Sequence, residues 1–207
     1  SRRQRQMCIR DRFKTSFLLD SEQTNMDECK SRFLNYKNQK LKYKFPNSFT
    51  GKIKKGSYKK NIIAAVIREK GINSEREMAY MLHLSGFEVK DVHMTDLVSG
   101  KENLENVNMV VFPGGFSNSD VLGSAKGWAG AFKYNEKAKK AINQFYSRSN
   151  TLSLGVCNGC QLMMELNLID KKLNGNHPKM EHNNSKKFEC IFSGIDILES
   201  NSVMLEN

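Results

Sequence analysis

The sequence lacks the long hydrophobic run of a membrane-spanning helix, because no apolar segment approaches the ~20 residues that such a helix needs. It also lacks the apolar segment of a secretory signal peptide. Its five cysteines are an odd number, and only one pair has a motif spacing, C-x-x-C. These absences argue against a membrane protein and a disulfide scaffold, and they predict reduced thiols in a cytosolic, cytoplasmic compartment.

Positive charge is confined to the first part of the chain. Residues 1–60 contain 17 Lys and Arg against 5 Asp and Glu, whereas residues 61–207 contain 16 against 17. All of the net charge of +11 therefore belongs to the first sixty residues. We predict a non-native Arg/Gln-rich leader at 1–12, a basic connector at 13–60 and a near-neutral globular domain at 61–207.

The connector contains lysines interleaved with aromatic residues, a combination that can bind single-stranded nucleic acid by charge and stacking. The residues concerned are Lys37, Lys40, Lys42 and Lys44, with Tyr36, Tyr43, Phe45 and Phe49. A charge run alone carries little information, so we expect a solvated linker and no nucleic-acid partner. A basic RNA-binding tail on an α/β scaffold stays the alternative.

Strand-like and helix-like segments alternate after residue 60. The expected strands are 62–67, 87–92, 107–112 and 152–156, with two short late strands at 188–192 and 195–198. The expected helices are 74–85, opened by a Ser74–Glu77 capping box, a short turn at 95–98, and 138–145. This alternation implies right-handed crossovers, and it predicts an α/β fold with a mostly parallel sheet and helices on both faces.

The spacing of apolar residues changes at Cys157, from alternation over 152–156 to helical spacing over 162–169. Gly155 and Gly159 flank the cysteine two residues away on either side, which is the thiol counterpart of the nucleophile elbow. Such a corner needs a strained backbone, and its flanking positions have no room for a Cβ atom. The helix N-terminus favours the thiolate, so Cys157 is a candidate nucleophile.

Other interpretations of Cys157 stay open on local pattern alone. Cys157 and Cys160 form a C-x-x-C at a helix start, which is typical of a redox pair. The same cysteines with His177 and His182 come close to a zinc-finger spacing, although the middle gap is slightly long. Cys157 could also be an inert buried thiol.

A glycine pair, Gly114-Gly115, directly follows the strand at 107–112. It is either a simple turn or a loop of free backbone N–H groups aimed at an anion. In parallel α/β sheets the chemistry lies beyond the carboxyl ends of the strands, where this loop and Cys157 both fall. A functional role for the loop therefore supports a functional role for Cys157, and the reverse also holds.

The combination of F-P-G-G-F with G-V-C-N-G-C-Q resembles the class I, triad-type glutamine amidotransferases, which have a flavodoxin-like fold. Longer stretches resemble the C-terminal glutaminase domain of large single-chain phosphoribosylformylglycinamidine synthases. These stretches are 68–78, 112–117, 120–129 and 154–161. The resemblance covers about 61–207, and 33–52 resembles the connector that leads out of the synthetase part.

The resemblance implies that Cys157 attacks the carboxamide of glutamine, forms a thioester and releases ammonia. It implies an oxyanion hole made by the backbone N–H groups of Gly115 and Asn158. It also implies a glutamine pocket lined by Gly114, Phe116 and Gln161. In the full enzyme, the ammonia converts formylglycinamide ribonucleotide to formylglycinamidine ribonucleotide in purine biosynthesis.

The family's catalytic base is a histidine followed two residues later by a glutamate, and none of the four histidines here has that neighbour. We therefore expect a fragment, inactive alone, without the synthetase domains that precede it and the His/Glu segment that follows it. The expected partners are glutamine and those synthetase domains, with no membrane. We expect no cofactor or metal in this domain, and ATP and magnesium in the synthetase part.

Overall fold

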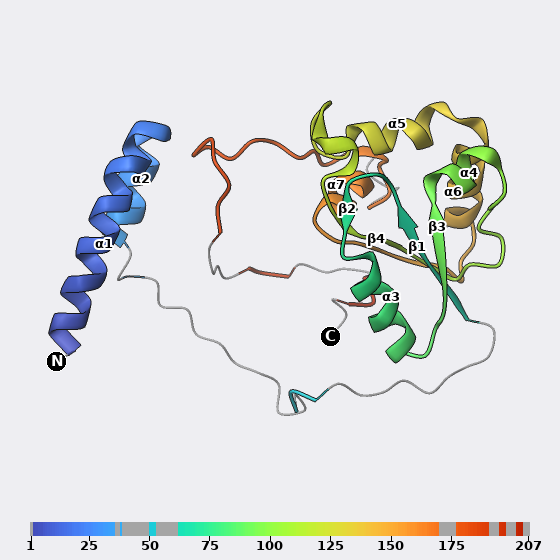
Figure 1. Cartoon of the computed structure of the whole chain (residues 1–207), viewed down its shortest axis with the longest axis horizontal. Helices are drawn as coiled ribbons and strands as arrows, with labels where there is room; N and C mark the ends of the chain where they lie inside the picture. The colour runs from blue at the N-terminus through green and yellow to red at the C-terminus, as the bar shows by residue number, and fades with distance from the viewer. Residues whose placement is uncertain are drawn as a thin grey trace. The chain divides into compact units, whose positions relative to one another are not determined.

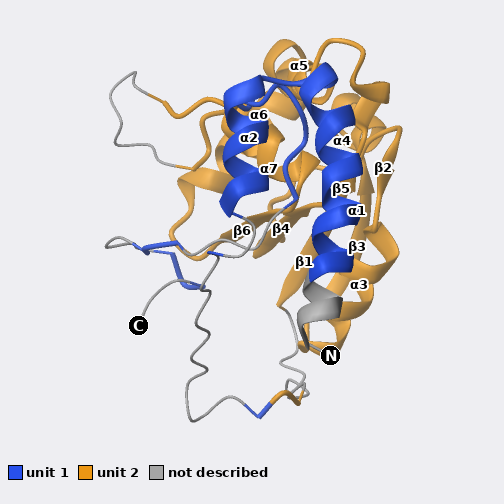
Figure 2. Ribbon diagram, turned by 90° about the vertical axis from the view of Figure 1, so that its left-hand side faces the viewer, with its two compact units in different colours: residues 1–50, 181–207 blue, residues 51–180 orange. Residues whose placement is uncertain are grey.

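The computed structural model describes residues 2–35, 38, 50–52, 62–169, 177–190, 195–197 and 202–204. The chain divides into two compact units, which Figure 2 distinguishes by colour. Unit 1 consists of 1–50 and 181–207, and unit 2 of 51–180. In the described part of the chain, no helix combines the length and the apolar character needed to cross a membrane.

Unit 2 is built on a four-stranded sheet in which every neighbouring pair is parallel (Figure 1). The strand order is β3-β1-β4-β6, with bounds β1 (Ile63–Arg68), β3 (Glu88–His93), β4 (Met109–Phe112) and β6 (Leu152–Gly155). Numbered along the chain, this is the 2-1-3-4 order of the flavodoxin-like doubly wound fold. A second, two-stranded antiparallel sheet pairs β2 (Ile72–Asn73) with β5 (Gly114–Gly115).

Helices cover both faces of the sheet, as predicted. Along β1, Ala65 and Ile67 belong to the larger hydrophobic cluster, whereas Ala64 and Val66 belong to the smaller one, because successive side chains of a strand point to opposite faces. The smaller cluster is covered by α3 (Glu75–Leu84). The larger is covered by α4 (Met94–Ser99), α5 (Lys126–Tyr134), α6 (Glu136–Ser147) and α7 (Asn158–Glu165).

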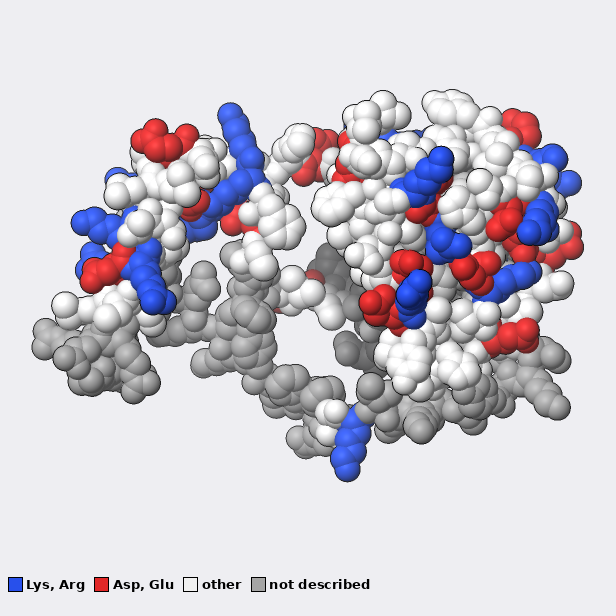
Figure 3. All heavy atoms as spheres, viewed as in Figure 1, with Lys and Arg blue, Asp and Glu red and all other residues white. Residues whose placement is uncertain are grey.

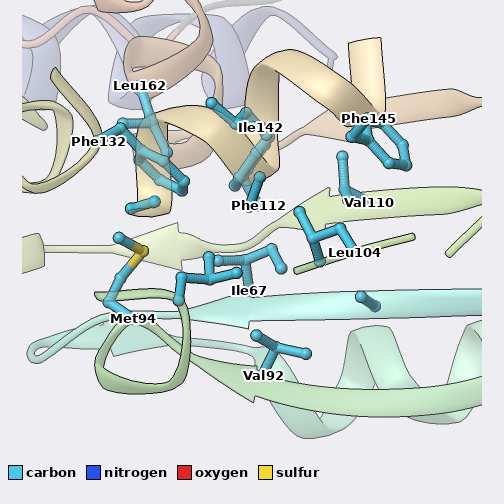
Figure 4. Close-up of a cluster of buried hydrophobic side chains, with 14 of the residues drawn as sticks. Ile67, Val92, Met94, Leu104, Val110, Phe112, Phe132, Ile142, Phe145 and Leu162 are labelled. Carbon is cyan, nitrogen blue, oxygen red and sulfur yellow. The ribbon is translucent and has the colours of Figure 1, made fainter. Parts of the chain in front are cut away.

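Three aromatic side chains occupy the larger cluster near the end of β4. The Phe112 ring meets Trp128 and Phe132 edge to face, with centroid distances of 5.9 and 6.3 Å. All three side chains are fully buried, and Figure 4 shows Phe112 and Phe132 within the cluster. Because Phe112 is the last residue of β4, this packing fixes the point at which the following glycine loop begins.

The structure corrects one local prediction and adds one helix. Ser74 has left-handed backbone angles (φ 71°, ψ 14°) and makes no side-chain cap, so the predicted Ser74–Glu77 capping box is wrong. Side-chain caps form from the extended region, which Ser74 does not occupy. A capping box instead opens α4, where His93 accepts from the Thr95 N–H and donates from its own N–H to Asp96. Helix α5 was not predicted.

Unit 1 contains two helices that sequence analysis did not expect, α1 (Arg2–Gln23) and α2 (Met26–Asn35). The Phe13 and Phe17 rings lie one helical turn apart, and both contact Phe33 of α2, with centroid distances of 5.6 and 4.7 Å. The apolar residues that appear scattered in sequence therefore form an aromatic stripe between helices. No helix was predicted within 13–35, and the assignment of 13–60 to a basic connector, like the other domain boundaries, stays a prediction.

Two further predictions concern segments that are only partly described. Residues 188–190 and 195–197 are not strands, so the two late strands are wrong there, and the remainder of each lies outside the described residues. The lysine-rich run at 37–49 also lies outside them, apart from Asn38.

Candidate active site

The glycine loop and the cysteine corner meet at the carboxyl end of the sheet. They follow β4 and β6, which are neighbouring parallel strands with Phe112 opposite Gly155. A Cβ atom placed on Gly114 would lie 3.2 Å from Cys157 Cβ and 3.8 Å from its sulfur. Gly114 thus gives the thiol room beside the loop. The structure brings together the two features that sequence analysis paired.

Cys157 sits on a strained backbone between β6 and α7. Its angles are φ 53° and ψ −109°, a sparsely populated conformation that costs roughly 1–3 kcal/mol. A Cβ on Gly155 would lie 2.6 Å from the Met163 sulfur, and a Cβ on Gly159 would lie 1.9 Å from the Phe112 carbonyl oxygen. The predicted steric reason for both glycines is confirmed, and Cys157 is solvent-exposed at the corner.

The backbone N–H of Gly115 is directed away from its neighbouring strand. The Phe116 N–H donates to the Gly71 carbonyl at 2.8 Å, while Gly115 lies opposite Ile72. In an antiparallel ladder, hydrogen-bonded and non-hydrogen-bonded residue pairs alternate. Because the neighbouring pair Gly71–Phe116 is hydrogen-bonded, the pair Ile72–Gly115 is not, and the Gly115 N–H does not donate to β2. Its φ of 108° and the closeness of Asn73 N to a Cβ placed here, 2.5 Å, both require glycine.

The second predicted donor, the backbone N–H of Asn158, is the first of α7. The opening N–H groups of a helix have no partner within the helix. Among the residues that the structure describes, none accepts a hydrogen bond from this N–H, whereas the Gln161 N–H already donates to the Cys157 carbonyl at 3.1 Å. The backbone N–H of Asn158, directly after Cys157, and that of Gly115, in the loop beside it, are therefore both available.

The side chain of Asn158 is a feature that sequence reasoning missed. It is 1% exposed and links three partners. Its Oδ1 accepts from the Ser117 N–H at 3.3 Å, and its Nδ2 donates to Asp120 Oδ1 at 3.4 Å and Gln161 Oε1 at 3.0 Å. Ser117 and Asp120 are 41 and 38 residues away, so no local pattern could have revealed these contacts.

A cavity of about 410 Å³ opens beside the same loop. It is lined by Glu69, Ser117, Asn118, Val121, Leu122, Gly123, Gly127 and Ala131. Its walls do not include Gly114, Phe116 or Gln161, so the predicted glutamine-pocket lining stays a prediction. Phe116 is 69% exposed, and Gln161 is half-buried.

The competing interpretations of the cysteines receive no support. All five cysteines are free thiols, including Cys157 and Cys160. The described residues include Cys157, Cys160, His177 and His182, and among them no group of three His, Cys, Asp or Glu side chains could hold a metal ion. Within unit 2, His177 makes no hydrogen bond to Cys157 in the part of the chain that the structure describes.

Unit 2 is thus an α/β domain with an exposed cysteine at a strained strand-to-helix corner, beside a glycine loop. The chain belongs to the CobB/CobQ-like glutamine amidotransferase domain family, whose match spans residues 61–207.

Three much longer relatives are named as phosphoribosylformylglycinamidine synthases. The chain is 39% identical over 202 residues to a probable phosphoribosylformylglycinamidine synthase, chloroplastic/mitochondrial, of Arabidopsis thaliana. It is 40% and 37% identical to phosphoribosylformylglycinamidine synthases of Dictyostelium discoideum and Drosophila melanogaster. Each alignment covers 93% of this chain but only 14 or 15% of the relative. A solved structure, that of PurLQS from Thermotoga maritima, aligns with a TM-score of 0.44 at 27% identity, covering 53% of this chain and 46% of that one.

Proposed function

We propose that this domain hydrolyses glutamine through a thioester on Cys157. The thiolate attacks the carboxamide carbon, the carbon–nitrogen bond breaks, and ammonia leaves after taking up a proton. Water then adds to the thioester, releasing glutamate and returning the thiol. The observation that carries the proposal is the exposed Cys157 at its elbow beside the Gly114-Gly115 loop.

The proposed oxyanion hole consists of the N–H groups of Gly115 and Asn158. The negative oxygen that forms during attack would be held by these two donors, each contributing on the order of 3 kcal/mol. The outward direction of the Gly115 N–H and the helix-end position of the Asn158 N–H support this role. Gly114, Phe116 and Gln161 are proposed to surround the substrate side chain.

For the whole protein, we propose the activity that the names of the relatives state. Ammonia from this domain would aminate formylglycinamide ribonucleotide in synthetase domains of the same polypeptide, in the cytoplasm. ATP and magnesium would be used there, and the glutaminase domain itself would use no cofactor. The support is the identity of 37–40% to synthases of which this chain spans 14 or 15%.

The proposal is tested by labelling the chain with a diazo-ketone analogue of glutamine. We expect one adduct, at Cys157, located by peptide mass mapping and suppressed by excess glutamine. Cys157→Ser removes the adduct, and Cys160→Ser is the matched control that retains it. Equal labelling of both cysteines would favour a redox pair and contradict the proposal.

Catalytic turnover by residues 1–207 is expected to be absent. A positioned histidine typically contributes ~10²–10⁴-fold to proton transfers of this kind, and no histidine here is followed two residues later by glutamate. We expect at most stoichiometric acylation of Cys157. Steady ammonia release that His177→Ala or His182→Ala abolishes would contradict this expectation.

A further inference from the structure

We infer that the side chain of Asn158 is a positioning residue that locks the glycine loop to the nucleophile helix. The inference rests on the proposed function and assigns a task to a different part of the same residue. The backbone of Asn158 is a proposed oxyanion donor, whereas its buried amide hydrogen-bonds with Ser117, Asp120 and Gln161. It is the one buried polar side chain adjacent in sequence to Cys157.

The chemistry of its surroundings fixes the orientation of the amide. Oδ1 faces an N–H donor, that of Ser117, while Nδ2 faces two oxygen acceptors, on Asp120 and Gln161. A flipped amide would oppose donor to donor and acceptor to acceptor. Because the residue is 1% exposed, water does not replace a lost partner, and each unmatched group is costly.

The loop held by Asn158 is strained. Asn118, Ser119 and Asp120 have consecutive left-handed φ angles of 51°, 55° and 51°. Such conformations persist only where surrounding contacts impose them. On one side, the Phe116 and Asn118 N–H groups donate to the carbonyls of Gly71 and Lys70 at 2.8 and 2.7 Å.

Asn158 supplies the anchor on the side of α7. Its acceptor bond is to the N–H of Ser117, two residues after Gly115. The position of the Gly115 N–H relative to Cys157 therefore depends on a side chain that follows the nucleophile directly. Asn158 thus contributes to both proposed oxyanion donors. Its own backbone N–H is one of them, and its side-chain amide positions the loop that carries the other, the N–H of Gly115.

Asn158 also orients a proposed substrate contact. The Asn158 Nδ2 group donates to Gln161 Oε1. Within the described part of the chain, no group accepts a hydrogen bond from Gln161 Nε2. That NH₂ group is left to donate to a ligand.

The test compares two reagents that alkylate Cys157. The diazo-ketone analogue of glutamine needs the oxyanion donors and the pocket, whereas iodoacetamide needs only an accessible thiol. We expect Asn158→Asp to lower the maximal labelling rate by the analogue about 10- to 100-fold, since one donor is lost and a carboxylate is placed beside Asp120. The iodoacetamide rate at Cys157 should change less than about twofold. Asn143→Asp, the same change on the exposed face of α6, should alter neither rate.

A complementary exchange separates positioning from mere structural support. In the double variant Asn158→Asp with Asp120→Asn, the new amide can donate to the new carboxylate. We expect this pair to recover most of the analogue rate. Asp120→Ala removes one partner of the amide without altering α7, and it should lower the labelling rate by the analogue several-fold. It replaces Asn158→Asp as the test variant if Asn158→Asp does not fold.

Each other outcome is decisive. Equal loss with both reagents, or no loss with either, overturns the inference while the proposed function stands, because the unchanged protein still labels at Cys157. Failure of the double variant to recover, with the single variant folded, also overturns it. Absence of glutamine-suppressible labelling in the unchanged protein overturns the proposed function, and the inference with it.

Discussion

The interactions that stabilise unit 1 internally differ from those that stabilise unit 2. Among the described side chains, every buried hydrophobic residue except Cys29 lies in unit 2. In unit 1, Arg32 pairs with Asp20 and Glu189, and Lys187 pairs with Asp20. All four of these side chains are 21–32% exposed. Burial of apolar area contributes far more per residue than solvent-exposed ion pairs do.

This contrast explains where the site is found. Chemistry that depends on fractions of an ångström needs a rigid support, and unit 2 supplies it through close packing under β4 and β6. Figure 3 shows acidic and basic side chains interspersed over unit 2 on the face in view, as expected for a surface that carries little net charge. Unit 1 has no comparable core among its described residues.

The largest expected effect comes from the core beneath the glycine loop. Phe112→Ala should lower the free energy of unfolding of unit 2 by about 3–5 kcal/mol, because it removes a fully buried ring from between Trp128 and Phe132. Urea unfolding followed by the fluorescence of Trp128, the sole tryptophan, measures this. Phe17→Ala in unit 1 is the control and should leave that transition unchanged. If Phe112→Ala and Phe17→Ala lowered the stability reported by Trp128 equally, the proposed difference between the two units would be wrong.

Unit 2 should lose stability at alkaline pH through Tyr146. Burial raises the pKa of Tyr146 from 10.0 to about 12, against a hydrogen bond with Ser153 that lowers it. The folded state therefore keeps a proton that the unfolded state loses above pH 10. Stability is full below pH 10 and falls by about 2–3 kcal/mol as the pH rises to about 12. Tyr146→Phe should flatten this part of the stability profile, and an unchanged slope would contradict the assignment.

The corner itself should be intolerant of one methyl group. Gly159→Ala is expected to cost about 1–3 kcal/mol and to slow labelling of Cys157, because its Cβ would lie 1.9 Å from a backbone oxygen. Gly130→Ala in α5 is the matched control: its nearest neighbour would be 3.9 Å away, and it should stabilise unit 2 by about 0.5–1 kcal/mol. Equal tolerance of both substitutions would remove the steric basis of the elbow.

The smallest effect is expected in unit 1. The hydrogen bond from Lys187, together with the charges of Lys187 and Arg32, lowers the pKa of Asp20 below 3.8. Its stabilisation is therefore present above that pH and is lost as the pH falls further. At neutral pH, Asp20→Asn should increase hydrogen exchange in α1 and α2 by an amount equivalent to at most about 1 kcal/mol.

Glu22→Gln is the control for this unit, since Glu22 is exposed and forms no ion pair with any described residue. It should leave exchange unchanged. A shift of the Trp128 transition by Asp20→Asn would show that the two units do not differ in the way described.

The sequence by itself determined the parallel α/β architecture and the corner at Cys157. Both depend on short-range rules: apolar spacing distinguishes strands from helices, and the steric demands of a sharp turn select glycine two residues to either side. The same reasoning failed for α1 and α2, because the partners of Phe13 and Phe17 lie on another helix. It failed at Ser74 because the hydroxyl's sequence spacing does not reveal a left-handed backbone.

Only the tertiary structure decided how the site is assembled. The direction of the Gly115 N–H follows from the pairing of β2 with β5, and the contacts of the Asn158 amide span about forty residues. Such contacts depend on strand register and on the packing of α7 against the loop, which no local pattern encodes. The residue types of the site are therefore readable along the chain, whereas their mutual orientation is a property of the folded sheet.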